Sequence, residues 1–384
     1  MDFEFTKEQR ELKDRLVQVV NQEIIPKASE YDSCQEVPKE LVRLFSHEGL
    51  FEFLVPEKYG GKGKDDLRAV EVSIIREELS RGSYQADTLF ALQALGSYSI
   101  VHSGSEQQKQ KYLPGVAKGK ILATMALTER EAGSDAANIQ TTATRDGDYF
   151  VLNGSKYFIS NARAAGLIVI FTSTDKSKRA KGVSAFIVEA GTPGLTLKPF
   201  RVISPHDIDE VVLTNCKVPK ENLLGELGGG FKVAMRTLDV IRTSVGAAAV
   251  GLAQSAFDYA LAWSKKRIQF GRPIAENQLI KAKLTDMATE IQAARFLVYY
   301  AAWLKDQGRR VIMESSMAKY WATEMAQRVV DQALQIHGGY GVMLDYPMER
   351  LYRNVRAARI YEGTTEIHKQ IVADQLLKRD GGSP

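Results

Sequence analysis

The chain has 384 residues, of which 44% are hydrophobic and 26% charged, the balance of a globular protein long enough for more than one domain. Its 51 basic and 47 acidic residues are mixed along the sequence and leave a net charge of only +4. The densest basic run, 176–181, contains no aromatic residue, so a solvated loop is a better interpretation than a nucleic-acid surface.

Three features of the sequence indicate where the protein works. Cys34 and Cys216 form no CxxC motif, which fits a reducing compartment. The N-terminal sequence MDFEFTKEQRELKDRL is acidic and has neither the apolar segment of a signal peptide nor a transit pattern. The uncharged run 243–257 is too short to span a membrane. We therefore expect a cytoplasmic protein of a bacterium or archaeon, or a mitochondrial-matrix protein after removal of a transit peptide, with no membrane or nucleic-acid partner.

The first part of the chain is predicted to be helical. Thr6 and Gln9 have the spacing of a capping box, and an apolar face follows at Leu12, Leu16, Val19 and Val20. The sequence PEKYGGKGK (56–64) indicates a loop, and a helical pattern resumes at Asp66.

The middle of the chain changes character. The turn signals Asp146-Gly147 and Asn153-Gly154 separate runs rich in Thr, Tyr, Phe and Val, which is typical of successive antiparallel strands. GLIVIFTST and GVSAFIVE continue this pattern. The middle zone is therefore predicted to be a small antiparallel β-domain.

From Gly230 onward the pattern is helical again. One apolar seam keeps 4-3-4-3-4 spacing, which suits packing in a long helical bundle, and consists of Ile280, Leu284, Met287, Ile291, Ala294 and Val298. We expect an α+β protein, mostly α, with an N-terminal helical domain at 1–118, a central β-domain at 119–225 and a C-terminal helical domain at 226–384.

Several familiar chemistries have no support. The five histidines show no metal spacing such as HExxH, so no metal site is predicted. There is no Walker A sequence, and GGYGVML (338–344) lacks the last glycine of GxGxxG and follows no predicted strand.

Polar and glycine-rich loops remain as candidates, each with a plainer alternative. MALTEREAGSD (125–135) could aim hydroxyl and backbone N–H groups at a flat polar ligand, or be only a loop. Phe158 and Ser160 share one face of a predicted strand and could meet a ring system, or Phe158 could be a core aromatic.

The C-terminal half has similar candidates. Asp239 and Arg242 lie one helical turn apart and could be an ordinary ion pair. KKRIQFGRP (265–273) places Arg267 and Gln269 before a turn, and Gln278 follows. The paired glycines of QIHGGYG (335–341) could admit a phosphate to the backbone or simply end a helix.

Glu362 occurs in the unusual stretch RIYEGTTEIHK (359–369). A glycine and two threonines follow it, which is a poor choice for a surface helix. Either Glu362 is a solvated loop carboxylate, or the chain has arranged space and partners around it.

These loops together resemble the acyl-CoA dehydrogenase family in order and spacing. The matching sequences are GSEQQKQKYLP, LTEREAGSD, VLNGSKYFISN, LDVIRTSVGAAAVGLAQ, KKRIQFGRPIAENQ, QIHGGYGV and IYEGTTEI, and they extend over essentially the whole chain. The resemblance implies an N-terminal helical domain, a central β-domain and a C-terminal four-helix bundle. It also implies a homotetramer, a dimer of dimers, whose FAD lies between β-domain and C-terminal helices and is partly held by a neighbouring subunit.

The resemblance assigns residues to cofactor and substrate. The flavin contacts are Ala126, Leu127, Thr128, Phe158 and Ser160. FAD contacts from the adjacent subunit are Arg267, Gln278, Gln335, Gly338 and Gly339, with further cofactor contacts from Thr364 and Glu366. The acyl-CoA is held by Ser134, Asp239 and Arg242, and Gly363 leaves it room. Phe158 and Ser160 depart from the family's usual Trp and Thr.

The resemblance also makes Glu362 the catalytic base. Forming a 2,3-double bond requires loss of the α-proton to a base and of the β-hydrogen, as hydride, to flavin N5. The FAD ribityl hydroxyl and the backbone N–H of Glu362 would polarise the thioester carbonyl. Burial should raise the pKa of Glu362 toward the working pH. Some members carry the base just before the arginine matching Arg242, where this chain has Ile241, which cannot abstract a proton.

Substrate signals are weaker. Glutaryl-CoA members have an arginine near YQADTLFALQ, and this chain has none there, which disfavours a dicarboxylyl substrate. Asp87 in that stretch is interpreted as an exposed or capping residue, or else as a second polar group facing a functionalised or cyclic acyl chain. In FRVISPHDIDEVVL (200–213), Ser204 and His206 stand where the family has Arg and Ser, which puts local flavin or substrate contacts in doubt.

The predicted function is FAD-dependent dehydrogenation of a short, branched or cyclic acyl-CoA, with electrons passed to an electron-transfer flavoprotein. The alternatives are the same oxidation on a carrier-protein-bound acyl or aminoacyl group, an acyl-CoA oxidase, and a non-enzymatic flavoprotein of the same fold.

Overall fold

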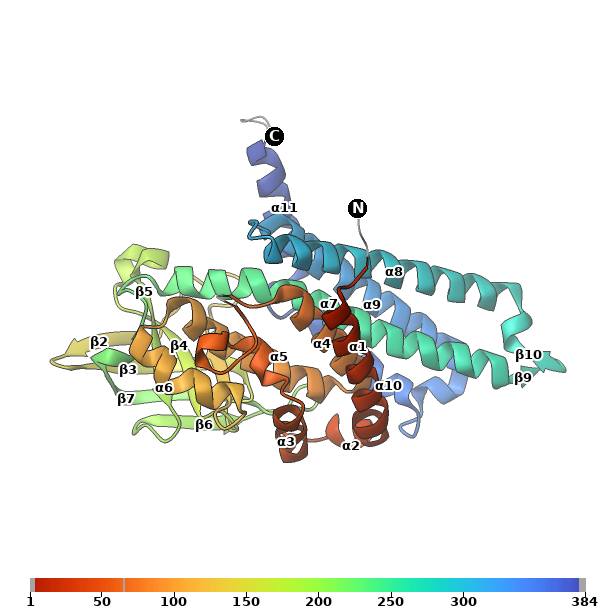
Figure 1. Ribbon diagram of the computed structural model, residues 1–384, viewed down its shortest axis with the longest axis horizontal. Coiled ribbons are helices and arrows are strands. Elements are labelled where there is room, and N and C mark those ends of the chain that lie inside the picture. Colours follow the sequence, from red (N-terminus) through yellow and green to blue (C-terminus); the bar gives the residue numbers. More distant parts are fainter. Residues whose placement is uncertain (1–3, 65, 380–384) are drawn as a thin grey trace. The chain divides into compact units, whose positions relative to one another are not determined.

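The computed structural model in Figure 1 describes residues 4–64 and 66–379. The chain divides into two compact units, each described here by itself. Unit 1 comprises Met1–Asp32, Ala69–Asp87 and Arg242–Pro384, and unit 2 comprises Ser33–Arg68 and Thr88–Ile241. The ends of the predicted N- and C-terminal domains, at 1–3 and 380–384, lie outside the described residues, and the predicted domain boundaries stay a prediction.

Unit 1 is helical. Its helices include α1 (Lys7–Val19), a π-helical turn (Val20–Ile24), α2 (Ala28–Tyr31), α4 (Ala69–Gly82), α8 (Gln278–Asp306), α9 (Ile312–His337), α10 (Pro347–Arg356) and α11 (Thr365–Arg379). Strands β9 (Ile268–Gln269) and β10 (Arg272–Pro273) form a small antiparallel pair in the same unit. Helices α5 (Tyr84–Ser103) and α7 (Gly230–Lys266) contribute residues to both units. The predicted capping box begins α1: the Gln9 N–H donates to Thr6 Oγ1 at 3.3 Å, and the Thr6 N–H donates to Gln9 Oε1 at 3.0 Å.

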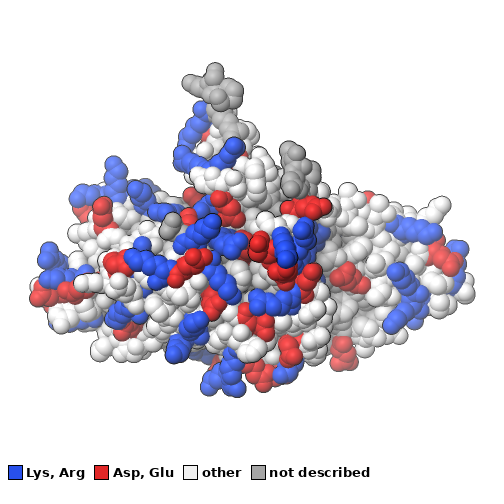
Figure 2. Space-filling model, in the orientation of Figure 1, with Lys and Arg blue, Asp and Glu red and all other residues white. Residues whose placement is uncertain are grey.

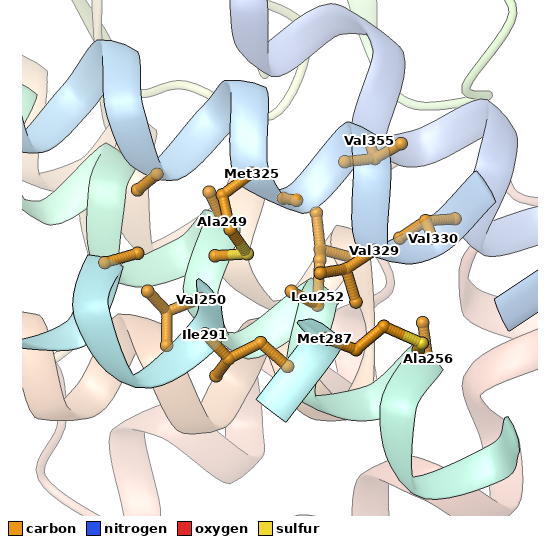
Figure 3. Close-up of a cluster of buried hydrophobic side chains, with 14 of the residues drawn as sticks. Ala249, Val250, Leu252, Ala256, Met287, Ile291, Met325, Val329, Val330 and Val355 are labelled. Atoms are coloured by element: carbon orange, nitrogen blue, oxygen red, sulfur yellow. The ribbon is translucent and has the colours of Figure 1, made fainter. Parts of the chain in front are cut away.

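The core of unit 1 lies among α7, α8, α9 and α10. Figure 3 shows side chains from these helices pointing toward one another, among them Val250, Met287, Ile291, Met325 and Val355. The predicted seam is confirmed: Met287, Ile291, Ala294 and Val298 are buried in this core, and Ile280 and Leu284 pack against it. Figure 1 shows α8 and α9 running side by side.

Small residues let α7 approach its neighbours closely. A Cβ added at Gly251 would lie 2.0 Å from the backbone oxygen of Glu77 in α4, and no flexible side chain could move to relieve that clash.

We therefore expect Gly251→Ala to lower the free energy of unfolding by about 3 kcal/mol or more, at or above the upper end for overpacking. Urea unfolding followed by circular dichroism would measure this. Gly133→Ala is the matched control, because no heavy atom lies within 4 Å of its added Cβ. Equal stability of the two variants would contradict the close approach.

Unit 2 contains an eight-stranded sheet. Its strands are β1 (Ala123–Ala126), β2 (Thr142–Asp146), β3 (Tyr149–Ser160), β4 (Leu167–Ser173), β5 (Val183–Glu189), β6 (Leu195–Pro199), β7 (Ile208–Pro219) and β8 (Leu223–Leu224). The strand order is β6-β7-β3-β2-β4-β5-β8, with β1 beside β4. Helices α3 (Lys39–His47) and α6 (Glu106–Ala117) belong to the same unit.

The predicted strands form, but the sheet is mixed rather than wholly antiparallel. Strands β2–β3 and β4–β5 pair antiparallel, whereas β1 and β2 both pair with β4 in parallel. Asp146-Gly147 makes the predicted turn, with Gly147 at φ +59°.

The second predicted turn, Asn153-Gly154, is wrong. Both residues lie inside β3, where the register to β7 shifts between Leu152 and Gly154. A Cβ at Gly154 would lie 2.7 Å from Thr141 Cα, so glycine serves a bulge and a close backbone approach.

One helix among the described residues, α7, has the length and apolar composition of a membrane span. However, 89% of its most apolar window is buried in the structure, as in a core helix. On the face drawn in Figure 2, basic and acidic side chains lie interspersed, in keeping with the small net charge.

Candidate active site

Glu362 lies on a tight turn in unit 1, before α11. Both Glu362 and Gly363 have positive φ, at +54° and +102°. A non-glycine residue in this region costs about 1–3 kcal/mol and persists only where its surroundings hold it. The unusual composition of this stretch therefore serves a strained turn and not a surface helix.

Three side chains hold the carbonyl groups of this turn. The Glu362 oxygen accepts from Arg242 Nε at 3.1 Å and from His368 Nε2 at 3.2 Å. The Gly363 oxygen accepts from Lys319 Nζ at 2.6 Å. We call Arg242, Lys319 and His368 the carbonyl clamp, because together they fix two consecutive peptide groups.

The side chains of the carbonyl clamp are buried, and burial affects the protonation states of His368 and Lys319. Burial lowers the pKa of His368 to about 3, so the ring is neutral. Its Nε2 must carry the proton, because it bonds to a carbonyl oxygen. Burial lowers the pKa of Lys319 to about 7, although the nearby Glu362 opposes that shift.

The Glu362 carboxylate is the group that the turn presents. Its Oε2 is buried and has no hydrogen-bond partner. Burial raises its pKa, and the cations Arg76, Lys319 and Arg242 oppose the rise. A carboxylate that is desolvated and lies among cations is suited to general-base chemistry.

Asp87 lies in a buried ion pair, which corrects its interpretation as an exposed or capping residue. Arg76 in α4 donates to both carboxylate oxygens, from Nε and Nη2, each at 2.8 Å. Arg76 Nη1 donates to Ser244 Oγ at 2.9 Å. Sequence reasoning missed Arg76, which directly follows the apolar pair Ile74-Ile75 and precedes two glutamates, as in an ordinary surface-charged helix.

A cavity of about 450 Å³ lies elsewhere in unit 1. Its lining consists of Trp263, Arg267, Gln269, Ile274, Ile336, His337, Gly338, Gly339, Tyr340 and Met343. Trp263 stacks on His337 with ring centroids 5.2 Å apart, and the Arg267 guanidinium lies 5.4 Å from the Tyr340 ring centroid. Trp263 Nε1 is buried without a hydrogen-bond partner.

This lining fits part of a dinucleotide. Aromatic faces suit a base or ring, a guanidinium suits a pyrophosphate, and Trp263 offers an unused N–H. Nothing lies within 4 Å of a Cβ added at Gly338 or Gly339, so a ligand can approach the backbone there.

Of the predicted cofactor residues, Arg267, Gly338 and Gly339 therefore lie together. Gln278, at the start of α8, and Gln335, near the end of α9, are exposed and are not part of the lining. Thr364 and Glu366 flank the start of α11, Thr364 half-buried and Glu366 exposed.

In unit 2, the remaining predicted flavin contacts lie at the ends of β1 and β3. Ala126 and Leu127 are buried, and the Thr128 oxygen accepts from the Tyr157 N–H at 2.8 Å. Phe158 has φ +60° and is 56% exposed, because a register shift between Lys156 and Ile159 breaks the strand. That shift removes the two-residue alternation from which Phe158 and Ser160 were predicted to share a face.

The divergent segment 200–213 is coupled to Ser160. His206 is buried, its Nδ1–H donates to the Ser204 oxygen at 2.8 Å, and its Nε2 lies 3.0 Å from Ser160 Oγ. Burial lowers the His206 pKa, so the ring is neutral and Nε2 accepts from the Ser160 hydroxyl. The two departures from the family pattern, at 160 and 206, are thus one hydrogen-bonded pair.

Two predicted substrate residues, Ser134 and Asp239, belong to unit 2. Ser134 is exposed in the loop after β1, and Asp239 lies on α7 one turn before Arg242. Among the described residues, no group of His, Cys, Asp or Glu could hold a metal ion.

Comparison with known proteins identifies the class. Models of the acyl-CoA dehydrogenase N-terminal, middle and C-terminal domains match residues 6–120, 124–216 and 228–377. The chain belongs to the acyl-CoA dehydrogenase family. It is therefore an FAD-dependent oxidoreductase acting on CH–CH groups.

Particular relatives are similar over almost their whole length. A 3-(aryl)acrylate reductase of Clostridium sporogenes is 43% identical, with 97% of this chain and 100% of the relative covered. The structure of butyryl-CoA dehydrogenase from Megasphaera elsdenii is 38% identical with a TM-score of 0.95, covering 98% and 100%. A chain in a structure described as the electron transferring flavoprotein of Acidaminococcus fermentans is 39% identical with a TM-score of 0.95, covering 98% and 100%.

Proposed function

We propose that this enzyme converts a short, branched or cyclic acyl-CoA into the 2-enoyl-CoA, with Glu362 as the base that removes the α-proton. The observation that carries the proposal is the buried Oε2 of Glu362, which has no hydrogen-bond partner on a turn held by the carbonyl clamp. The α-proton of a thioester is a weak acid, so a positioned base of raised pKa suits its removal. FAD, when bound, supplies the acceptor for the β-hydride.

The same turn has a second task in this proposal. The backbone N–H of Glu362 polarises the thioester carbonyl as negative charge develops on its oxygen. Gly363 leaves room for the thioester, and Ser134, Asp239 and Arg242 contact the CoA ester. The clamp supports these roles because it fixes the peptide groups beside the base.

Cofactor binding is assigned from the family resemblance. We infer that Ala126, Leu127, Thr128, Phe158 and Ser160 contact the flavin. Thr364 and Glu366 contact the rest of FAD. Further contacts come from an adjacent subunit of a homotetramer, through Arg267, Gln278, Gln335, Gly338 and Gly339. The fit of the cavity lined by Arg267, Gly338 and Gly339 supports this inference.

Arg267→Ala is expected to weaken FAD binding by about 1.5–3 kcal/mol, roughly 10- to 100-fold in Kd, because a charge-assisted hydrogen bond is lost. Fluorescence titration of the apoprotein with FAD would measure the Kd. The control is Arg309→Ala, an exposed arginine between α8 and α9 that does not line the cavity. An unchanged Kd in Arg267→Ala would contradict the assignment.

The acyl group is expected to be uncharged at its far end. Asp87 already accepts two hydrogen bonds from the Arg76 guanidinium, so those donors are not available to a second carboxylate of the substrate. A panel of straight, branched, aromatic and alicyclic acyl-CoAs, assayed with an artificial electron acceptor, tests the substrate class. No response to any CoA ester, with turnover of carrier-protein-bound acyl or aminoacyl groups, would replace the proposal with its carrier-protein alternative.

Reduction of a 2-enoyl thioester is a second candidate, favoured by the similarity to the 3-(aryl)acrylate reductase. Reduction reverses the proton transfer, so Glu362 must be protonated to donate to the α-carbon. Dehydrogenation should therefore rise with pH through the Glu362 pKa, and reduction should fall. Rates measured in both directions across pH would show which one operates near neutrality.

We also infer transfer of electrons to an electron-transfer flavoprotein, and a cytoplasmic location or a mitochondrial-matrix one. The Acidaminococcus structure supports the electron partner. Rapid reoxidation of the reduced enzyme by oxygen, without reduction of an added electron-transfer flavoprotein, would favour an oxidase instead. Light scattering of the holoenzyme tests the tetramer.

A further inference from the structure

A fully buried ion pair in unit 1 joins Arg76 of α4 to Asp87 in the first turn of α5. Arg76 is 1% exposed and Asp87 3% exposed, and two parallel hydrogen bonds of 2.8 Å join them. Burying two charges is expensive, so such a pair is weak evidence for stability. Apolar residues of similar volume would fill the same space at lower cost, which raises the question of what the pair does.

The ion pair is hydrogen-bonded to α7, the helix whose Arg242 also holds the turn at Glu362. Arg76 Nη1 donates to Ser244 Oγ at 2.9 Å, and Ser244 lies two residues after Arg242 on α7. Arg242 in turn donates to the Glu362 oxygen at 3.1 Å. Three of the guanidinium N–H groups are thus directed by Asp87 and Ser244, which leaves Arg76 no freedom to turn away.

Charged groups from several elements act on the Glu362 carboxylate. Among the described residues they include the cations Arg76, Lys319 and Arg242 and the anion Asp87, and Tyr361 and the neutral His368 are titratable neighbours. Among the cations, Arg76 opposes the effect of burial on the Glu362 pKa most strongly, and Asp87 adds to that effect. Arg242 and Lys319 donate to backbone oxygens of the turn, whereas Arg76 donates to Asp87 and Ser244.

We propose that Arg76 is a positioning residue for the base: clamped by Asp87 and Ser244, it holds a fixed positive charge beside Glu362, and Asp87 moderates that charge. This inference rests on the proposed role of Glu362. A fixed cation favours the ionised carboxylate that accepts a proton, while a fully unopposed cation would make that carboxylate too weak a base. The pair sets the strength of the base without touching the substrate.

The two members of the pair should therefore have opposite effects on the pH profile. Dehydrogenation is lost as pH falls through the Glu362 pKa, because only the ionised form accepts the proton. Removing the Arg76 cation raises that pKa and moves the acidic limb to higher pH. Removing the Asp87 anion lowers it and moves the limb to lower pH. A purely structural role would lower the rate in both variants without opposite displacements.

The test is the pH profile of kcat/KM for Arg76→Gln and Asp87→Asn holoenzymes with an acyl-CoA turned over by the wild type. We expect displacements of roughly one pH unit in opposite directions, the lower end of the effect of a neighbouring charge. Arg76→Lys keeps the cation and should restore the wild-type limb. The double variant Arg76→Gln/Asp87→Asn removes both charges and should lie between the single variants. Deprotonation of Lys319 near pH 7 is common to all variants and does not produce opposite shifts.

A second readout does not depend on turnover. The pH dependence of the charge-transfer absorbance formed when a 3-thiaacyl-CoA loses its α-proton in the active site should shift in the same two directions. If the acidic limbs of the pH profiles coincide in all variants, or shift in the same direction, the inference about Arg76 and Asp87 is wrong. The role of Glu362 as the base would not be affected. Wild-type enzyme that neither turns over nor ionises any CoA ester would instead overturn the proposed function. If Arg76→Gln does not fold, the test rests on Asp87→Asn and Arg76→Lys. The proposal is contradicted if the acidic limb of the Asp87→Asn pH profile lies at the same pH as that of the wild type, or at a higher pH.

Discussion

Glu362→Gln is expected to lower kcat by about 10²–10⁴-fold or more, while FAD remains bound and the protein remains folded. Glutamine keeps the size of the side chain and removes its ability to take a proton. The carbonyl clamp holds backbone oxygens and not the carboxylate, so the turn should keep its geometry. Steady-state rates with an artificial acceptor, flavin absorbance and thermal unfolding together check the result.

The matched control is Asp374→Asn, an exposed acid on α11 that follows the same turn. It should leave kcat unchanged. If Glu362→Gln retained the wild-type rate, another group would have to be the base. Ile241, at the alternative position of the family, cannot supply it.

Gly363→Ala is expected to impair both stability and catalysis. Gly363 has φ +102°, and an added Cβ would lie 2.8 Å from His368 Nε2. Backbone strain alone costs about 1–3 kcal/mol. The clash also displaces one member of the carbonyl clamp, and a shift of about 1 Å in a catalytic group can cost roughly 100-fold in rate. We expect both losses, measured by urea unfolding and by kcat.

Gly308→Ala separates the two causes. Gly308 has φ +73° but nothing within 4 Å of an added Cβ, so this variant reports strain without a clash. Gly363→Ala should lose far more activity than Gly308→Ala at a comparable loss of stability. Equal activity in the two variants would show that His368 does not hold the turn.

Local rules predicted the parts of the fold that depend on near neighbours. The Thr6–Gln9 capping box, the α8 seam around Ile291 and the turn at Gly147 all form as expected. These features need only propensity, periodicity or a single glycine. Gly154 was mistaken for a turn, because a glycine demanded by a bulge and one demanded by a turn look alike in sequence.

The candidate site divides in the same way. Glu362 and Gly363 stand out in sequence because their composition suits no ordinary helix, and a strained turn is the reason. The partners that govern the base do not stand out. Asp87 and Arg76 are separated along the chain, and only the three-dimensional structure shows that they form an ion pair. Sequence patterns place a charge on an element, but burial and pairing decide its effect.

The link between Ser160 and His206 illustrates the same limit. Each departs from the family pattern on its own, and their 3.0 Å contact joins residues from different strands and loops. Taken alone, the departure at His206 puts the local flavin or substrate contacts in doubt. In the structure, the His206 ring and the Ser160 hydroxyl are hydrogen-bonded to each other.

The most direct test of the central claim is anaerobic mixing of the FAD-loaded enzyme with acyl-CoAs of the panel, followed by flavin absorbance in a single turnover. The wild type should lose its flavin absorbance with at least one short, branched or cyclic acyl-CoA, and Glu362→Gln should retain it under the same conditions. Bleaching of Glu362→Gln at the wild-type rate would contradict the assignment of the base, and a wild type that no CoA ester bleaches would contradict the proposed reaction.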